Sequence, residues 1–390
     1  MVTCYGLGTI IGAGIYVLLG SVAGFAGNWL PFSFLMAGAI AAFTALSYAE
    51  LSSRLPQCAG AAIYVHEAWW NKGLSTVVGW MLVLTGIVSA AAIANGFVGY
   101  LNVFISIEGA LAISILILAL GFIAGWDMQA SAVMIAIVTL IEVGGLILVI
   151  TFAISADPIA VTEVSTTPAI PGTVAGVLLG GFIAFYAFIG FEDMVNIVEE
   201  VKEPERNMPF GIIVSVLIAI GLYFLVAMAA LHVMPASELA QSEAPLADMM
   251  LASGGGTFFI TLISLVAVIN GALVQIIMAS RVLYGMAGKD MAPTILGSIN
   301  PQTQTPVVAT AFVTSLVLIF ALALPLTELA QLTSFIMLII FALVNAALIV
   351  IKRRTYKYYV GINLPVFIPT IGAMTASMLL IYQVLSFIVF

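Results

Sequence analysis

Long apolar segments separated by short polar ones form the dominant pattern along this chain. Each is close to the roughly 20 residues that a helix needs to cross a bilayer, so we interpret them as membrane spans. The eleven predicted spans lie at 1–25, 31–54, 73–105, 109–125, 128–154, 171–198, 208–234, 255–287, 306–325, 328–351 and 364–388. The third and eighth are the longest, and we expect tilted helices there. The pattern predicts an all-α polytopic protein embedded in the lipid bilayer.

Composition agrees with this prediction and excludes a soluble protein. Hydrophobic residues make up 63% of the chain and charged residues only 7%, with a mean hydropathy of +1.24. Such a chain has too few charges to stay dissolved. Its two cysteines, Cys4 and Cys58, match neither a disulfide framework nor a metal-ligand spacing. We expect no metal, no cofactor and no nucleic-acid partner. We also expect no signal peptide, because no basic segment precedes the first span.

The positions of the basic residues predict the orientation. They are Arg54, Lys72, Lys202, Arg206, Arg281, Lys289, Lys352, Arg353, Arg354 and Lys357. With eleven spans, all of them fall in or beside the loops after spans two, six, eight and ten. The loops after spans five and seven carry acidic residues without any Lys or Arg. The positive-inside rule then predicts an integral protein of the plasma membrane with its N-terminus in the cytoplasm.

Glycines interrupt two of the predicted spans at corresponding positions. The first span contains GTIIGAGIYVLLG (8–20), and the sixth contains GVLLGGFIAFYAFIGFED (176–193). The order of span lengths also repeats, the second with the seventh and the third with the eighth. An odd number of spans separates the repeats, so they face opposite ways across the membrane. Paired interruptions in inverted halves indicate a transporter site near the midplane.

This pattern predicts an organisation in three parts. Residues 1–154 form a first repeat of five spans, 171–351 form an inverted second repeat, and 364–390 add one span. Gly8 and Gly12 also form a GxxxG pattern, which is typical of helix packing. The paired positions favour broken helices in spans one and six, with packing as the expected role of Gly8.

Four motifs carry a family resemblance. They are GTIIGAGIY (8–16), RLPQCAGAAIYVHEAW (54–69), FYAFIGFEDMVNIVEEVKEPERNMP (185–209) and SRVLYGMAGKDMAP (280–293). In sequence and order they resemble the amino acid–polyamine–organocation superfamily of transporters. The resemblance implies a five-plus-five inverted-repeat fold, alternating access, and amino acids or amines as substrates. Members of that superfamily usually have twelve or more spans. Because all ten repeat-forming spans are present, we expect a complete substrate site.

The two breaks predict how an amino acid is bound. Unwinding at Gly12, Ala13 and Gly14 would free amide N–H groups at a half-helix N-terminus, which favours an anion such as the substrate carboxylate. Main-chain carbonyls that end half-helices would accept the substrate ammonium group. These are the carbonyls of Ile10, Ile11, Tyr186, Ala187 and Ile189. The second break is expected at Gly190. Ala13, Ala187 and Ile189 would line a tight apolar space, which favours a small neutral L-amino acid.

Two of these candidate roles rest on the resemblance. Tyr186 matches the position at which related transporters place an aromatic lid. The alternative is a tyrosine packed between helices with its hydroxyl satisfied. Glu192 follows IGF, where related exchangers carry a carboxylate tied to their pH response; a solvated structural acid is the alternative.

Glu142 is the only ionisable residue in the interior of the fifth span. Intramembrane carboxylates are functional candidates by default. Several proton-coupled relatives carry a lysine near this point, whose role cannot be transferred to a residue of opposite charge. Glu142 could take up a proton, or hold a sodium ion together with Asn270 and backbone carbonyls of the first span. A third interpretation is a permanently protonated structural side chain.

The function predicted from the sequence is secondary active transport of amino acids, with proton-coupled symport as the leading interpretation. Amino acid or amine exchange, sodium-coupled symport and a non-transporting amino acid sensor stay as alternatives. An enzyme would need a nucleophile–base pair or metal ligands, and no such set of residues occurs. A channel would need a continuous polar lining, whereas the polar residues of these spans cluster at the two breaks. The sequence fixes no oligomeric state.

Overall fold

A computed structural model describes residues 1–12, 14–56, 60–126, 132–158, 174–354 and 361–389, and within these ranges the chain forms helices and no strand. The helices of the predicted spans are α1 (Val2–Ile11), α2 (Gly14–Ala26), α3 (Leu30–Arg54), α5 (Lys72–Asn102), α6 (Gly109–Gly125), α7 (Ala132–Ser155), α8 (Val174–Ala184), α9 (Pro204–Val233), α12 (Thr257–Ala287), α13 (Val307–Ala323), α14 (Leu326–Arg354) and α15 (Phe367–Val389). Two 3₁₀ segments continue α8, namely η2 (Phe185–Phe188) and η3 (Phe191–Glu200). The connecting segments contain η1 (Gly27–Trp29), α4 (Gly60–Trp69), α10 (Ala236–Leu239), α11 (Pro245–Ala252) and η4 (Thr294–Gly297).

The predicted all-α polytopic fold is confirmed. Eight helical stretches of the described chain are long and apolar enough to cross a membrane. One of them, Val2–Arg54, contains both the first and the second predicted span. Two shorter apolar helices, Gly109–Gly125 and Val307–Ala323, correspond to the fourth and ninth. Every predicted span therefore has a matching helix in the structure.

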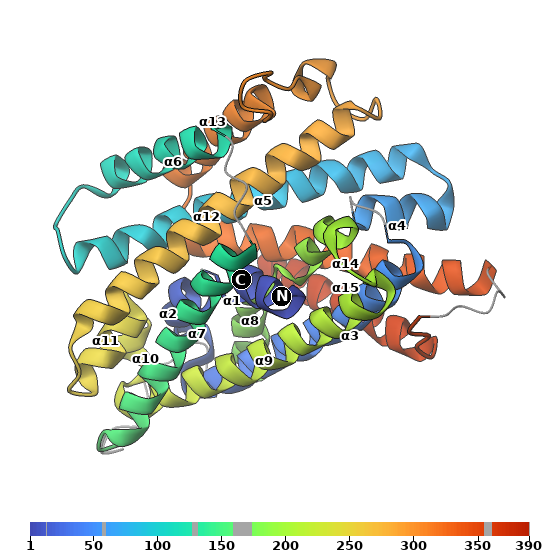
Figure 1. The fold of residues 1–390 in the computed structure, drawn as a ribbon. Coiled ribbons are helices and arrows are strands. Elements are labelled where there is room, and N and C mark those ends of the chain that lie inside the picture. Colours follow the sequence, from blue (N-terminus) through green and yellow to red (C-terminus); the bar gives the residue numbers. More distant parts are fainter. Residues whose placement is uncertain (13, 57–59, 127–131, 159–173, 355–360, 390) are drawn as a thin grey trace.

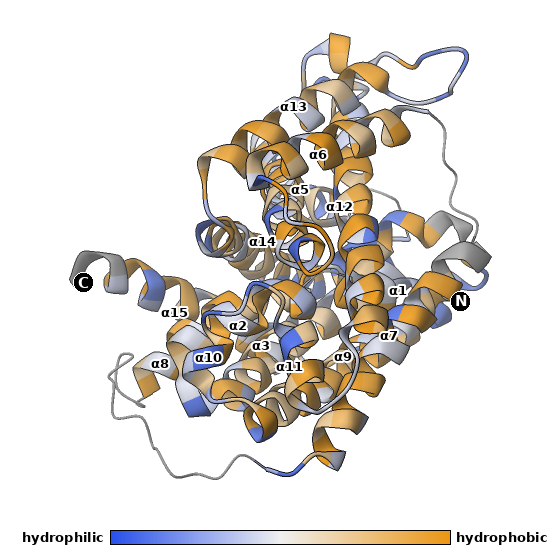
Figure 2. Ribbon diagram, turned by 90° about the vertical axis from the view of Figure 1, so that its left-hand side faces the viewer, coloured by the Kyte–Doolittle hydropathy of each residue, from blue (hydrophilic) through white to orange (hydrophobic). Residues whose placement is uncertain are grey.

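The outer helices expose apolar side chains, as lipid contact requires. On α6, Leu111, Ile115, Leu118 and Phe122 are each at least half exposed, while the opposite face of this helix is buried. A helix that is apolar on all faces is suited to a position between the protein interior and the lipid hydrocarbon. Figure 2 shows the same distribution, with hydrophobic residues covering the outer helices and hydrophilic residues concentrated in the loops.

Corresponding predicted spans lie side by side. The second-span helix α3 packs along the seventh-span helix α9, and the third-span helix α5 packs along the eighth-span helix α12 (Figure 1). The interrupted first and sixth spans occupy the interior between these pairs. There α1 contacts α7 and α9, and α2 contacts α8. Almost every residue of α2 is buried, so this half-helix is surrounded by protein.

The segment after α9 is folded, although its polar sequence predicted only a loop. Its short helices α10 and α11 pack against α2. A Cβ atom built on Gly20 would lie 2.6 Å from the backbone oxygen of Leu239. Glycine at this position therefore lets the connecting segment approach the second half of the interrupted first span.

A buried ion-pair cluster joins the ends of α3 and α14 to the segment that precedes α15. The fully buried Glu50 pairs through Oε1 with Arg54 at 2.7 Å and with Lys352 at 2.5 Å. Its Oε2 accepts the backbone N–H of Leu364 at 2.9 Å, and Lys352 also donates to Asn363 Oδ1 at 2.9 Å. One carboxylate thus connects elements from three distant parts of the sequence.

We expect Glu50→Ala to destabilise the folded protein strongly. It leaves Arg54 and Lys352, which are nearly buried, without their anion, and such a loss costs about 3–5 kcal/mol of unfolding free energy. The measurement is thermal unfolding of the purified protein in detergent. Glu205→Ala, which truncates an exposed glutamate, is the control. Equal midpoints for the two variants would contradict a structural role for this cluster.

Candidate functional site

Both interrupted spans break where the glycines predicted. In the first span, α1 ends at Ile11, Gly12 donates its N–H to the Gly8 carbonyl at 3.2 Å, and α2 begins at Gly14. Ala13, a predicted substrate-binding residue, lies outside the described residues. In the sixth span, Ile189 is extended and Gly190 has φ of 132°. That φ lies in a region that residues with a Cβ atom rarely adopt.

The two breaks are packed against each other without room for side chains. A Cβ atom on Gly14 would lie 2.6 Å from Cα of Ala187, and one on Gly190 would lie 2.3 Å from the carbonyl oxygen of Thr9. Each distance is shorter than van der Waals contact allows. The glycines are therefore needed for the close approach of two unwound backbones.

Tyr223 of α9 links the two breaks by hydrogen bonds. Its hydroxyl lies 2.9 Å from the Ile10 carbonyl oxygen and 3.0 Å from the Ala187 carbonyl oxygen, so its single proton is shared between one acceptor of each broken span. Its ring packs on Phe188 with centroids 5.0 Å apart. Sequence reasoning missed this residue, although a tyrosine in the middle of an apolar span is a signal for a buried polar contact.

We expect Tyr223→Phe to loosen this junction. The ring contacts stay, but two buried carbonyls lose their donor, which costs about 1–3 kcal/mol of stability. Transport in proteoliposomes should fall and the unfolding midpoint should drop. Tyr382→Phe, at a partly buried position with one long hydrogen bond of 3.4 Å, is the control. Unchanged transport and stability for Tyr223→Phe would show that the hydroxyl is dispensable.

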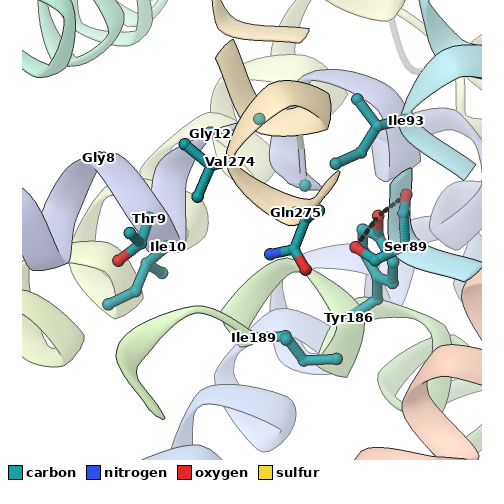
Figure 3. Close-up of a pocket in the computed structure, with 12 residues that line it drawn as sticks. Gly8, Thr9, Ile10, Gly12, Ser89, Ile93, Tyr186, Ile189, Val274 and Gln275 are labelled. Carbon is teal, nitrogen blue, oxygen red and sulfur yellow. Dashed lines mark hydrogen bonds between the residues drawn. The ribbon is translucent and has the colours of Figure 1, made fainter. Parts of the chain in front are cut away.

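A cavity of about 30 Å³ lies between the breaks (Figure 3). Among the predicted residues, those that line it are Ile10, Gly12, Gly14, Tyr186 and Ile189. Ile11, Ala187 and Gly190 lie at the breaks but are not lining residues. The helices α5 and α12 complete the wall with Ser89, Ile93, Gly271, Val274 and Gln275. The lining combines glycine backbone with apolar side chains and with four uncharged polar ones, namely Thr9, Ser89, Tyr186 and Gln275.

Tyr186 is held against α5 by its hydroxyl. The oxygen lies 2.8 Å from Ser89 Oγ and 3.0 Å from the Ser89 carbonyl (Figure 3). The tyrosine thus has a satisfied hydroxyl and also forms part of the cavity wall. Sequence reasoning missed Ser89. This residue lies within a run of small residues, so the sequence offers only a weak signal that it belongs to the site.

Glu142 and Asn270 are brought together beside the first break. The Glu142 side chain is completely buried, and its Oε1 lies 3.4 Å from Nδ2 of Asn270. Its Oε2 is buried and has no hydrogen-bond partner among the described residues. The backbone carbonyl of Glu142 accepts the hydroxyl of Tyr16 from α2 at 2.6 Å. This carboxyl therefore lies between the fifth, eighth and first spans.

Glu192 and Asp193 follow the second break directly and are both buried. Glu192 Oε2 accepts the N–H of Gly190 at 2.9 Å, so its carboxyl caps the break instead of contacting the cavity between the breaks. Asp193 Oδ2 lies 3.5 Å from Nε2 of Gln275, a residue that lines that cavity. Sequence reasoning named Glu192 as a site residue but not Asp193 or Gln275.

Comparison with known proteins identifies the family. The model of the family described as amino acid permease matches residues 1–390. The branched-chain amino acid permease BcaP of Bacillus subtilis is 30% identical over 90% of this chain and 80% of its own length. The vacuolar cationic amino acid transporter 4 of Arabidopsis thaliana is 29% identical over 89% of this chain, which spans only 61% of that relative. The methylthioribose transporter of Bacillus subtilis is 25% identical over 97% of this chain and 85% of its own length.

Proposed function

This chain belongs to the amino acid permease family, and we propose that it is a secondary active transporter that moves amino acids across the plasma membrane by alternating access. The observation that carries the proposal is the meeting of two unwound backbones around one cavity. Free main-chain groups at membrane depth are tolerated where they line such a site. The family consists of transporters and not of enzymes, so we assign no catalytic residues.

The proposed architecture has two inverted repeats, residues 1–154 and 171–351, with 364–390 as an additional span. Support comes from the two interrupted helices at corresponding positions and from the packing of α3 with α9 and of α5 with α12. The distribution of basic residues supports a cytoplasmic N-terminus. In this arrangement the breaks lie near the bilayer midplane. A substrate site at this depth can open in turn to each side of the membrane.

Main-chain groups perform the proposed recognition. Amide N–H groups at the start of α2 bind the substrate carboxylate, because a helix N-terminus favours an anion. Carbonyls of Ile10, Tyr186 and Ile189, which line the cavity, accept the ammonium group, and those of Ile11 and Ala187 join them when the breaks move apart. Tyr223 already uses one lone pair of Ile10 and of Ala187, and each carbonyl oxygen has a second. Tyr186 acts as a lid over the substrate cavity, and its side chain moves when the two breaks move.

The substrate that fits best is a small neutral L-amino acid. A cavity of about 30 Å³ holds about two water molecules, so a substrate requires the walls to move apart. The smaller the side chain, the smaller this movement. The described residues that line the cavity also include no charged side chain that would pair with a basic substrate.

The test is uptake by purified protein in proteoliposomes, with competition by each standard amino acid and by polyamines. We expect saturable uptake of alanine, serine or glycine. Competition by arginine, lysine or putrescine alone would replace this substrate class with a cationic one. Binding without flux would indicate a sensor instead of a carrier.

Glu142 is the proposed coupling residue. A buried carboxyl beside Asn270 and the first break can exchange a proton as the breaks move, or can hold a sodium ion with nearby oxygens. Proton coupling is the version that we propose, because the unpartnered Oε2 offers a place for a proton.

A further inference from the structure

A second cavity, of about 20 Å³, is lined by residues of η3, α3, α4, α5 and α12. Its polar lining comes from Tyr48 of α3 and from Glu192, Asp193 and Asn196 of η3. Gly60 and Ala61 of α4 and Met278 of α12 contribute apolar or small groups. This volume accommodates one water molecule or an ion of similar size. The proposed transport mechanism does not use this cavity.

The two carboxyls of this cavity are buried without a basic partner. Glu192 is 6% exposed and Asp193 is 4% exposed. None of the lining residues is basic, and the ion pairs recorded in the described part of the chain all involve Glu50. Burying a carboxylate without a counter-charge is costly, so this site requires protons or a bound cation.

Tyr48 provides an independent observation that points to a ligand. Its side chain is fully buried, it lines the cavity, and its hydroxyl has no hydrogen-bond partner among the residues that the structure describes. Buried hydroxyls are nearly always hydrogen-bonded, because an unsatisfied one loses its contacts with water. The ring is fixed by edge contacts to Tyr64, Phe191 and Phe341, with centroids 5.6–5.9 Å apart. The unpaired oxygen is therefore placed by the fold.

We propose that this second cavity binds a small monovalent cation, either an alkali metal ion or a primary ammonium group, through Glu192, Asp193 and the Tyr48 hydroxyl. Oxygen ligands of this type suit hard cations and ammonium donors alike. A calcium ion would need six to eight oxygens, and magnesium would retain several waters. One oxygen of each carboxyl is already engaged by the Gly190 N–H or by Gln275, which leaves too few oxygens for calcium, and the cavity has no room for the waters that magnesium retains.

The bound cation is connected to the substrate cavity by two contacts. Glu192 holds the N–H of Gly190 at the break, and Asp193 holds Gln275, which lines the substrate cavity. Occupation of the second cavity therefore fixes two side chains that support the substrate site. This cation site is distinct from the proposed coupling site at Glu142 and Asn270.

The test measures thermal unfolding of the purified wild-type protein at about pH 8, where free carboxyl groups are ionised. Sodium, potassium, lithium and methylammonium chlorides are each titrated at constant ionic strength against choline chloride, without any amino acid. A ligand that binds only the folded state raises the unfolding midpoint with concentration. We expect this for at least one of the four cations. Stabilisation by metal ions assigns an alkali site, and stabilisation by methylammonium alone assigns an ammonium site.

Three variants locate the effect. Glu192→Gln and Asp193→Asn should raise the half-maximal cation concentration by about tenfold or more, because each removes a charge from the site. Tyr48→Phe removes only an unpartnered hydroxyl, so this variant should fold normally and bind the cation more weakly. Glu238→Gln, which removes an exposed carboxylate of α10, is the matched control and should respond like the wild type.

The proposal is overturned if none of the four cations exceeds choline in the wild-type protein. It is also overturned if the effect survives in both Glu192→Gln and Asp193→Asn, because the cation would then bind elsewhere. Because no amino acid is present, these results do not depend on whether the protein transports. Failure of the cation site and failure of the transport proposal are therefore distinguishable.

Discussion

Gly14→Leu should abolish transport while the protein still inserts into the membrane. A Cβ atom at Gly14 already lies 2.6 Å from Cα of Ala187, and the remaining leucine atoms would push the two breaks apart. Leucine is favourable in a bilayer, so insertion should survive. Gly12→Leu should act in the same direction. The measurement is amino acid uptake in proteoliposomes containing matched amounts of protein.

Gly221→Leu is the control for this substitution. Gly221 lies on the exposed side of α9, and a Cβ atom there meets nothing within 4 Å. Gly221→Leu makes the same chemical change within a membrane span but away from the breaks, so this variant should retain uptake. Normal uptake by well-inserted Gly14→Leu protein would show that the two breaks need not approach each other closely for transport.

Glu142→Gln should lose gradient-driven accumulation of substrate but keep substrate exchange. The glutamine is nearly the same size and can still contact Asn270, so the packing of α7 on α2 and α12 should persist. It cannot gain or release a proton, and it carries no charge to hold a cation. Uptake is measured under an imposed pH gradient and then under a sodium gradient, with exchange measured separately without either gradient.

Glu238→Gln, at an exposed position of α10, provides the comparison for loss of a carboxylate. It should accumulate substrate like the wild-type protein. Loss of accumulation in Glu142→Gln under the pH gradient alone assigns proton coupling, and loss under the sodium gradient assigns sodium. If Glu142→Gln still accumulates substrate under both gradients, Glu142 is a structural residue.

The sequence by itself determined the membrane spans and the positions of the breaks. Each crossing helix must hide its backbone from hydrocarbon over the bilayer thickness, so the signal for a span is contained in one continuous apolar segment. The signal for the break at Gly190 was equally local, because the φ of 132° at this residue favours glycine, which has no side chain. The position of a carboxylate inside an apolar span also singled out Glu142, and the family resemblance suggested Asn270 as its neighbour; the structure places Oε1 and Nδ2 of these side chains 3.4 Å apart.

Only the tertiary structure decided which polar groups meet. Tyr223 bonds to Ile10, 213 residues away, and Lys352 pairs with Glu50 across 302 residues. Asp193 meets Gln275, and the Tyr48 hydroxyl meets no hydrogen-bond partner within the described part of the chain. Nearly every face of these spans is apolar, so the sequence pattern does not show which face turns inward. A buried polar group acquires its partner, or lacks one, when the helices pack, and that packing is a property of the whole chain.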